Sequence, residues 1–341
     1  MTNRTNQKWV LAKRPKGQPT EDCFRLEEES VGELAEGEIL VGIKYLSLDP
    51  YMRGRMREGK SYAEPIQVGE IITGECAGVV IESKSPRWQE GDTLTVHEGW
   101  QSLARVNGEA ASLLPADTEL APLSAWLGPV GMPGRTAYFG LQRVGQPKRG
   151  ETLVVSAASG AVGSVVGQIG SLKGLRVVGV AGGAEKCAYC VEELGFDACI
   201  DYKAGSLEEE LSAACPDGVD IYFENVGGAV TRAVAGLLND GARVPICGFV
   251  SLYNSEEDIT QVETPFTVLA GLETPPEHRF FLVREWFDEW LEASAELAGW
   301  IQSGELKYRE TVAEGLDQAP TAFRGLLNGQ NFGKQLVRVA P

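Results

Sequence analysis

An alternation of short apolar strands with helices after residue 150 constrains this fold more than any other feature. An expected strand at 151–157 leads into a helix at 161–173, where apolar residues recur at helical spacing. Further strands are expected at 175–180, 197–200 and 242–249 and within 219–228, and further helices at 184–194, 207–215 and 229–240. Such alternation gives a parallel sheet covered on both faces, so we expect a doubly wound α/β domain.

The remainder of the chain has a different pattern of residues. Up to about residue 130, short runs of Val, Ile, Thr and Tyr are broken by Gly, Pro and Asp, which predicts a β-rich region. After about residue 255 the sequence becomes acidic, aromatic and largely helical, and it ends in an apolar strand. A length of 341 residues suits about two domains.

Charge and composition exclude several classes of function. The net charge of −17 opposes binding to nucleic acid or to an anionic membrane. We identify neither a signal peptide nor an apolar run near ~18 residues, so no membrane span is expected. Seven scattered cysteines suit a reducing compartment, and we expect a cytoplasmic protein.

Metal ligands are scarce in this sequence. His97 and His278 are its two histidines, and it lacks a four-cysteine zinc lobe. Cys187 and Cys190 form a C-x-x-C inside an expected helix without a second pair, so we interpret them as partly buried thiols. No metal site is expected.

One turn carries a nucleotide-binding pattern, Ala158-x-Gly160-x-x-Gly163, between an expected strand and helix. Gly160 would let the backbone approach a pyrophosphate, Gly163 would let helix pack on strand, and the helix N-terminus offers N–H groups. Alanine suits the first position only if φ stays negative there. A purely structural turn is the alternative, but the surrounding alternation favours a dinucleotide site.

The cofactor preference follows from the end of the second strand. NAD enzymes place a carboxylate there for the ribose 2′-hydroxyl, whereas this chain has Gly182 and Gly183. Lys186 follows and could pair with a 2′-phosphate; the alternative is a solvated helix residue. We therefore predict NADPH over NADH.

Six ordered segments now carry a family resemblance: 46–56, 131–141, 157–168, 185–203, 222–228 and 331–334. Together they resemble zinc-independent medium-chain dehydrogenase/reductases of the leukotriene B4 12-hydroxydehydrogenase/prostaglandin reductase type, a group that includes curcumin-reductase-like enzymes. The resemblance implies a GroES-like catalytic domain from 1–130 and 305–341 and a Rossmann NADP-binding domain from 131–304. It also implies a homodimer that reduces C=C bonds of α,β-unsaturated ketones and aldehydes with NADPH.

The resemblance also implies a set of cofactor-binding residues. They are Gly160, Ala161, Val162, Gly163, Lys186, Tyr202, Asn225, Cys247, Gly248, Phe249, Val250, Ser251, Tyr253, Phe281, Leu282, Val283 and Asn331. The chain departs from the family pattern at 254–283, where only Phe281 to Val283 can be matched. That segment normally shapes the substrate pocket and the dimer contact, so substrate size and assembly stay open.

Reduction of an activated alkene needs a hydride at the β-carbon, a donor for the carbonyl oxygen and a proton for the α-carbon. A neutral phenol suits the second task, because its ordinary pKa is about 10. The resemblance makes Tyr253 and Tyr51 the catalytic candidates, and a core aromatic is the alternative for each. Arg53 and Arg55 are either structural or face an acidic substrate. Solvent could supply the proton.

Three other functions remain open on sequence alone. An NADPH:quinone oxidoreductase shares this architecture and also lacks zinc. A zinc-dependent alcohol dehydrogenase is disfavoured by the missing ligands. A non-catalytic NADPH-binding adaptor, for example in membrane traffic, would bind cofactor without turnover.

Overall fold

The computed structural model describes residues 4–58, 63–256 and 261–339. The chain divides into two compact units. The first comprises residues 1–128, 310–331 and 335–341, and the second comprises residues 129–309 and 332–334. The segment that departs from the family pattern falls in the second unit, and its residues 257–260 lie outside the described part.

The second unit is built on a parallel sheet of six strands among the described residues, in the order β10-β9-β8-β11-β12-β13. Its strands are β8 (Thr152–Ser156), β9 (Arg176–Ala181), β10 (Ala198–Asp201), β11 (Val219–Phe223), β12 (Leu238–Ile246) and β13 (Glu277–Phe280). Its helices are α2 (Met132–Phe139), α3 (Gly163–Leu172), α4 (Ala184–Glu192), α5 (Leu207–Ala214), α6 (Gly228–Ala235), α7 (Pro265–Ala270) and α8 (Trp290–Ser303). This is the doubly wound sheet that the alternation predicted.

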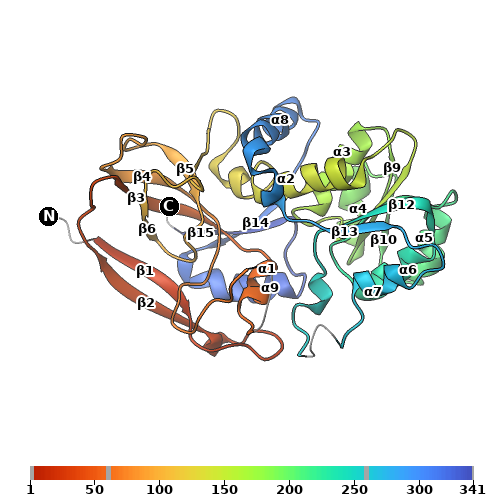
Figure 1. Cartoon of the computed structure of the whole chain (residues 1–341), viewed down its shortest axis with the longest axis horizontal. Helices are drawn as coiled ribbons and strands as arrows, with labels where there is room; N and C mark the ends of the chain where they lie inside the picture. Colours follow the sequence, from red (N-terminus) through yellow and green to blue (C-terminus); the bar gives the residue numbers. More distant parts are fainter. Residues whose placement is uncertain (1–3, 59–62, 257–260, 340–341) are drawn as a thin grey trace. The chain divides into compact units, whose positions relative to one another are not determined.

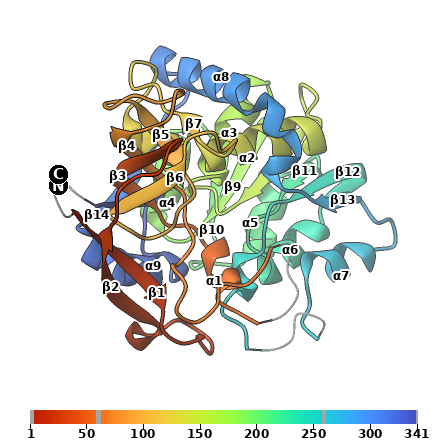
Figure 2. The same cartoon turned by 60° about the vertical axis from the view of Figure 1, so that its left-hand side comes forward.

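Alternate side chains of the central strands enter two different cores. In β8, Leu153 and Val155 pack into one core, while Val154 packs into the other. Successive side chains of a strand point to opposite faces, so a run without polar interruption requires cover on both sides. Figure 1 shows that cover, with α2, α3 and α8 on one side and α5, α6 and α7 on the other. Helices α6 and α7 lie side by side in Figure 2 as well.

One expected helix is shorter than the sequence predicts. We expected residues 229–240 to be helical, but α6 ends at Ala235 and β12 begins at Leu238. Leu238 pairs with Val219 of β11, and the Val219 amide donates to Leu237 O at 2.8 Å. Pairing with the neighbouring strand therefore overrides the local helical pattern.

The first unit is mainly antiparallel β structure. Its larger sheet has the strand order β14-β15-β3-β4-β5-β7, with β6 also paired to β3. The elements are β3 (Glu38–Ser47), α1 (Tyr51–Arg55), β4 (Cys76–Ser83), β5 (Thr93–Val96), β6 (Leu103–Asn107), β7 (Leu114–Pro115), β14 (Glu310–Glu314), α9 (Ala319–Leu327) and β15 (Lys334–Arg338). Trp100 is fully buried in its core, with the Phe24 ring stacked at 5.8 Å and the Phe323 ring edge-on at 5.4 Å.

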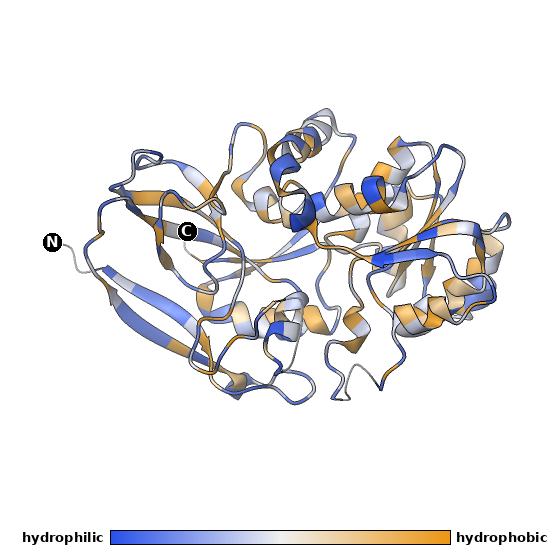
Figure 3. Cartoon of the chain, viewed as in Figure 1, coloured by the Kyte–Doolittle hydropathy of each residue, from blue (hydrophilic) through white to orange (hydrophobic). Residues whose placement is uncertain are grey.

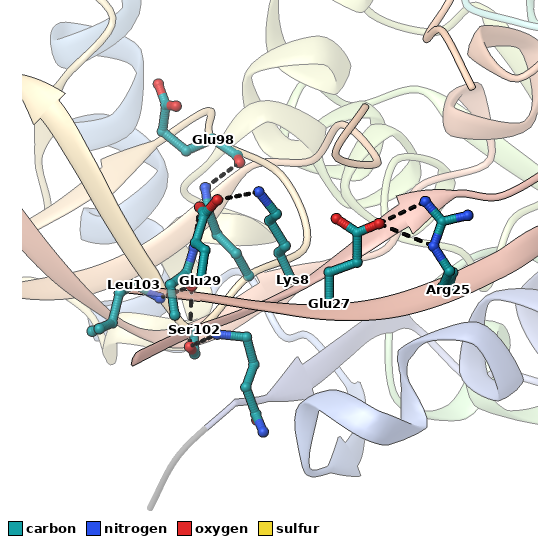
Figure 4. A network of polar contacts seen from close by, with 10 residues as sticks. Lys8, Arg25, Glu27, Glu29, Glu98, Ser102 and Leu103 are labelled. Atoms are coloured by element: carbon teal, nitrogen blue, oxygen red, sulfur yellow. Dashed lines mark hydrogen bonds and ion pairs between the residues drawn. The ribbon is translucent and has the colours of Figure 1, made fainter. Parts of the chain in front are cut away.

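Strands β1 (Arg4–Leu11) and β2 (Phe24–Val31) form a separate antiparallel ribbon that is mostly hydrophilic (Figure 3). Polar contacts fix it, as Figure 4 shows. The Lys8 ammonium pairs with Glu29, and the buried Asn6 side chain accepts from the Leu103 amide at 2.9 Å. The Lys8–Glu29 pair joins the two strands, whereas the Asn6 contact and the buried Leu11 and Phe24 attach the ribbon to the rest of the first unit.

Two helical glycines give a matched test of packing in the second unit. A Cβ on Gly167 of α3 would lie 1.9 Å from the buried Phe196 ring, whereas one on the exposed Gly299 of α8 meets nothing within 4 Å. We expect Gly167→Ala to lower the free energy of unfolding by about 1–3 kcal/mol. Gly299→Ala should raise it by about 0.5–1 kcal/mol. Urea unfolding of both variants measures this; equal effects would contradict the packing.

Candidate functional site

Most of the predicted cofactor-binding residues lie directly after strands of the parallel sheet. The chain leaves β8 toward β9 and β10 on one side and returns to β11 and β12 on the other. In such sheets, ligands bind outside the carboxyl ends of the strands where the strand order reverses. Here that point lies between β8 and β11, so the segments after these strands form the candidate site.

The glycine-rich turn follows β8. Ala157 carries the left-handed conformation, with φ of 52°, while Ala158 keeps a φ outside that region. The alanine in place of the first motif glycine is therefore tolerated because the unusual backbone angle falls one residue earlier. A Cβ on Gly163 would lie 2.3 Å from Ala157 O, so only glycine lets the helix begin this close to the turn.

Ala161 and Val162 connect this turn to α3, whose first residue is Gly163. The helix N-terminus thus presents backbone N–H groups where a pyrophosphate would bind. Gly160 forms a parallel bridge with Gly333 of the C-terminal segment. Asn331, two residues before Gly333, belongs to the first unit.

The turn after β9 is held by a carboxylate from the end of β10. Asp201 Oδ1 accepts from the amides of Gly183 at 2.8 Å and Lys203 at 3.0 Å. Gly183 has φ of 106°, and a Cβ on Gly182 would lie 2.8 Å from the Tyr202 ring. Gly182 therefore leaves room for Tyr202 and Lys203 over the turn, and Gly183 supplies the positive φ that the turn needs.

Two cations share this turn. Burial, followed by the nearby Lys203 ammonium, lowers the pKa of the half-buried Lys186. The Lys203 ammonium also lies 5.6 Å from the centre of the exposed Tyr202 ring. The sequence patterns did not single out Lys203 or Asp201; their positions at and just after the end of a parallel strand were the available signal.

Asn225 lies two residues after the end of β11 and is anchored to β8. Its amide donates to Ser156 Oγ at 2.8 Å, and its Nδ2 donates to Ser156 O at 2.8 Å. The preceding Glu224 is fully buried, and the sequence reasoning also did not single it out. The backbone of Asn225 is thereby fixed at the switch point.

The segment after β12 folds back over this loop. The Cys247 amide donates to Glu224 O at 2.9 Å, and the Val250 amide to Asn225 O at 3.0 Å. A Cβ on Gly248 would lie 2.7 Å from the Tyr253 hydroxyl, so that phenol lies against the Gly248 backbone.

Two further side chains of this segment have defined surroundings. The Phe249 ring meets Tyr253 edge-on at 6.1 Å, and the exposed Ser251 hydroxyl donates to Val226 O at 2.5 Å. Burial, followed by Glu224, raises the pKa of the Cys247 thiol to about 12, which keeps it protonated. Tyr253 itself is half-buried.

Phe281, Leu282 and Val283 follow β13. Phe281 is buried in the core, with its ring edge-on to Phe223 at 6.0 Å. Leu282 and Val283 are half-buried, and the Leu282 amide donates to Glu285 Oε1 at 2.7 Å.

In the first unit, Tyr51 begins α1 and is half-buried against the core. Arg53 is 1% exposed, and its guanidinium donates to Gly17 O at 2.5 and 3.1 Å. Burial lowers the pKa of Arg53 to about 10. Arg55 Nε donates to Glu64 O at 2.7 Å. Both guanidinium groups thus bind main-chain oxygens, which favours the structural interpretation of these arginines.

The two cysteines of the C-x-x-C pair lie in a core of the second unit. Cys187 and Cys190 are buried and free, and burial raises the pKa of Cys187 to about 12. Within the described ranges, no group of three or more His, Cys, Asp or Glu side chains is placed to hold a metal ion. Among the same residues, no helix is long and apolar enough to cross a membrane.

Comparison with known proteins identifies two family models. Residues 7–114 match the N-terminal domain of oxidoreductase, and residues 161–271 match a model described as zinc-binding dehydrogenase. The chain is 47% identical to the NADPH-dependent curcumin reductase of Escherichia coli, over 98% of this chain and 97% of that protein. It is 41% identical to prostaglandin reductase 1 of Oryctolagus cuniculus, over 96% and 91% of the two chains.

Comparison with solved structures identifies oxidoreductases as well. The crystal structure of CurA from Vibrio vulnificus in complex with NADPH is 44% identical, with a TM-score of 0.91 over 98% of this chain and 99% of that one. The Escherichia coli quinone oxidoreductase complexed with NADPH is 20% identical, with a TM-score of 0.78 over 97% and 99%. The second likeness concerns the fold alone.

The carboxylate of Asp201 gives a pH prediction. Hydrogen bonds from the Gly183 and Lys203 amides lower its pKa from the ordinary 3.8. A lowered folded-state pKa means that this stabilisation is present above pH 3.8 and is lost as the pH falls through the folded value. We expect Asp201→Asn to be less stable than the wild type at pH 7 in urea unfolding, with the gap closing below about pH 4. The exposed Asp240→Asn is the control; a pH-independent gap would contradict the assignment.

Proposed function

The chain belongs to the medium-chain dehydrogenase/reductase family, in the group that holds the curcumin and prostaglandin reductases, and from this premise we propose that it reduces the C=C bond of α,β-unsaturated ketones and aldehydes. It is an NADP-dependent oxidoreductase. The observation that carries the proposal is the placement of the predicted cofactor residues directly after successive parallel strands, in a chain 47% identical to a curcumin reductase.

The residues of the second unit fit NADP(H). The N-terminus of α3 would receive the pyrophosphate, because Gly160 and Gly163 keep side chains out of that turn. Lys186, Lys203 and Tyr202 would hold the 2′-phosphate, in a turn where even one Cβ on Gly182 would collide. When bound, the cofactor supplies the hydride that reduction of the alkene requires.

The task left to the protein is the charge that develops on the substrate's carbonyl oxygen. A fixed O–H donor stabilises this oxygen more in the transition state than in the ground state. We assign the donation to Tyr253, with Tyr51 as the second candidate. The contact of the Tyr253 hydroxyl with the Gly248 backbone supports its place in the segment beside the cofactor. The α-carbon would take its proton from solvent.

The oligomeric state and the cellular compartment are proposed from the same family membership. We propose a homodimer in the cytoplasm that works without zinc, in which the first unit is the catalytic domain and the second the NADP-binding domain. The divergent segment 254–283 would adapt the substrate pocket or the dimer contact.

Cofactor preference can be tested at Lys186. Lys186→Gln removes a cation opposite the 2′-phosphate, so we expect the KM for NADPH to rise about 10-fold or more while the KM for NADH stays unchanged. Steady-state kinetics with both cofactors measures the change. Lys148→Gln, an exposed lysine before β8, should change neither value. An unaltered KM for NADPH in the Lys186 variant would overturn the assignment.

Catalysis can be tested at the two tyrosines. Loss of an oxyanion donor typically costs about 10²–10³ in kcat, so we expect this drop for Tyr253→Phe on an enone. Tyr51→Phe tests the second candidate in the same assay. Tyr138→Phe, in α2 and outside the predicted site, is the control and should keep kcat; the hydroxyl of Tyr138 donates to Glu296 Oε2 at 2.5 Å. A near-normal kcat in Tyr253→Phe would exclude that tyrosine as the donor.

The reaction class is tested by one panel of assays. Enones, enals and quinones are offered with NADPH and with NADH, and both cofactor oxidation and the product are followed. We expect saturated ketones or aldehydes with NADPH. Turnover confined to quinones would instead identify a quinone oxidoreductase, and NADPH binding without any turnover would identify an adaptor.

A further inference from the structure

Glu224 is a wholly buried carboxylate that has no role in the proposed reaction. It stands directly after β11, at the edge where the strand order of the sheet reverses. Its Oε1 accepts from Ser156 Oγ at 3.1 Å and from the amides of Val226 at 2.7 Å and Gly227 at 3.0 Å. Its Oε2 accepts from the Thr231 hydroxyl. One side chain therefore joins β8, the loop after β11 and helix α6.

The backbone of Glu224 adds a fourth element to this junction. Its amide donates to Pro245 O at 2.9 Å, and its carbonyl accepts from the amides of Cys247 at 2.9 Å and Gly248 at 3.3 Å. The end of β12 is thereby tied to the same residue. Removing the side chain would leave the half-buried Val226 amide and the buried Gly227 amide without this acceptor, which costs more than an ordinary hydrogen bond contributes.

The same contacts hold the residues that we assign to the cofactor. Ser156 Oγ, which donates to Glu224, also accepts from the Asn225 amide at 2.8 Å. The loop that Glu224 caps then accepts from the amides of the next segment, at Asn225 O from Val250 and at Val226 O from Ser251, each at 3.0 Å. Glu224 therefore controls both the Asn225 loop and the 247–251 segment.

A comparable carboxylate at the other end of the same strand provides a contrast. Asp220 of β11 accepts from the Thr152 amide of β8 at 2.8 Å and from Asn239 Nδ2 at 2.9 Å. It also joins β8 to β11, but at the amino ends of the strands, away from the site. Asp220 therefore serves as the matched control for a purely structural role.

We propose that Glu224 is a positioning residue that fixes the Asn225 loop and the 247–251 segment for the nicotinamide half of NADP(H). The inference rests on the proposed function. A doubly wound sheet binds one half of a dinucleotide on each side of the point where the strand order reverses. The proposed 2′-phosphate residues Lys186, Lys203 and Tyr202 assign the adenosine half to the β9 side, which leaves the segments after β11 and β12 for the nicotinamide half. A change at Glu224 should therefore weaken only one half of the cofactor site.

The test compares two ligands that differ in the nicotinamide half. Affinities for NADPH and for 2′,5′-ADP are measured by calorimetry on wild type, Glu224→Met and Asp220→Leu. We expect Glu224→Met to weaken NADPH about 10-fold or more while 2′,5′-ADP stays within about 2-fold. Asp220→Leu should keep the wild-type ratio of the two affinities, even where it lowers the melting temperature.

Conservative variants keep the test decisive. Glu224→Gln retains one acceptor for the Val226 and Gly227 amides, so its NADPH affinity should lie between wild type and Glu224→Met. If Glu224→Met does not fold, Ser156→Ala takes its place, since it removes the hydroxyl that links Glu224 to Asn225; the same selective loss is expected.

The wild type and the variants test different proposals. A wild type that does not bind NADPH overturns the proposed function. A wild type that binds NADPH, with a replacement variant that loses both ligands equally or neither, overturns the positioning role of Glu224.

Discussion

Parallel pairing of six strands, buried on both faces, is the constraint on which the second unit depends. Apolar side chains cover both faces of the sheet, as the adjacent residues Leu153 and Val154 of β8 show. The polar groups of the candidate site therefore lie at the ends of the strands. Because the strands are parallel, every carboxyl end arrives at one edge. The segments after the strands are thus brought together by the topology, although they are far apart in sequence.

Buried or edge carboxylates then give those segments a fixed shape. Asp201 accepts from the amides of the turn after β9, and Glu224 accepts from the amides of the loop after β11. Each provides acceptors for backbone N–H groups that no helix or strand satisfies. The two carboxylates thus fix the backbone of the segments in which we propose that Lys186, Tyr202 and Tyr253 bind cofactor or substrate.

The sequence predicted the parts of this site that follow from local rules. The glycine pattern around Gly160, the helix after it and the absence of a carboxylate at Gly182 can be read from spacing and residue type. The end of α6 could not, because Leu238 is drawn into β12 by its partner Val219. The roles of Asp201 and Glu224 could not be predicted either, since an acidic residue at the end of a strand has no distinctive sequence pattern until its hydrogen-bond donors are known.

The sequence by itself determined the doubly wound class, the dinucleotide turn and the preference for NADPH, because each depends on periodicity or on one short segment. Only the tertiary structure decided which residues support these segments. It placed the left-handed backbone angle at Ala157, one residue before the motif alanine, directed Arg53 to the Gly17 carbonyl and placed Glu224 at the junction of four elements. The bonds of Arg53 to Gly17 and of Glu224 to Ser156 join residues far apart in the sequence, and such pairings arise only when the chain has folded.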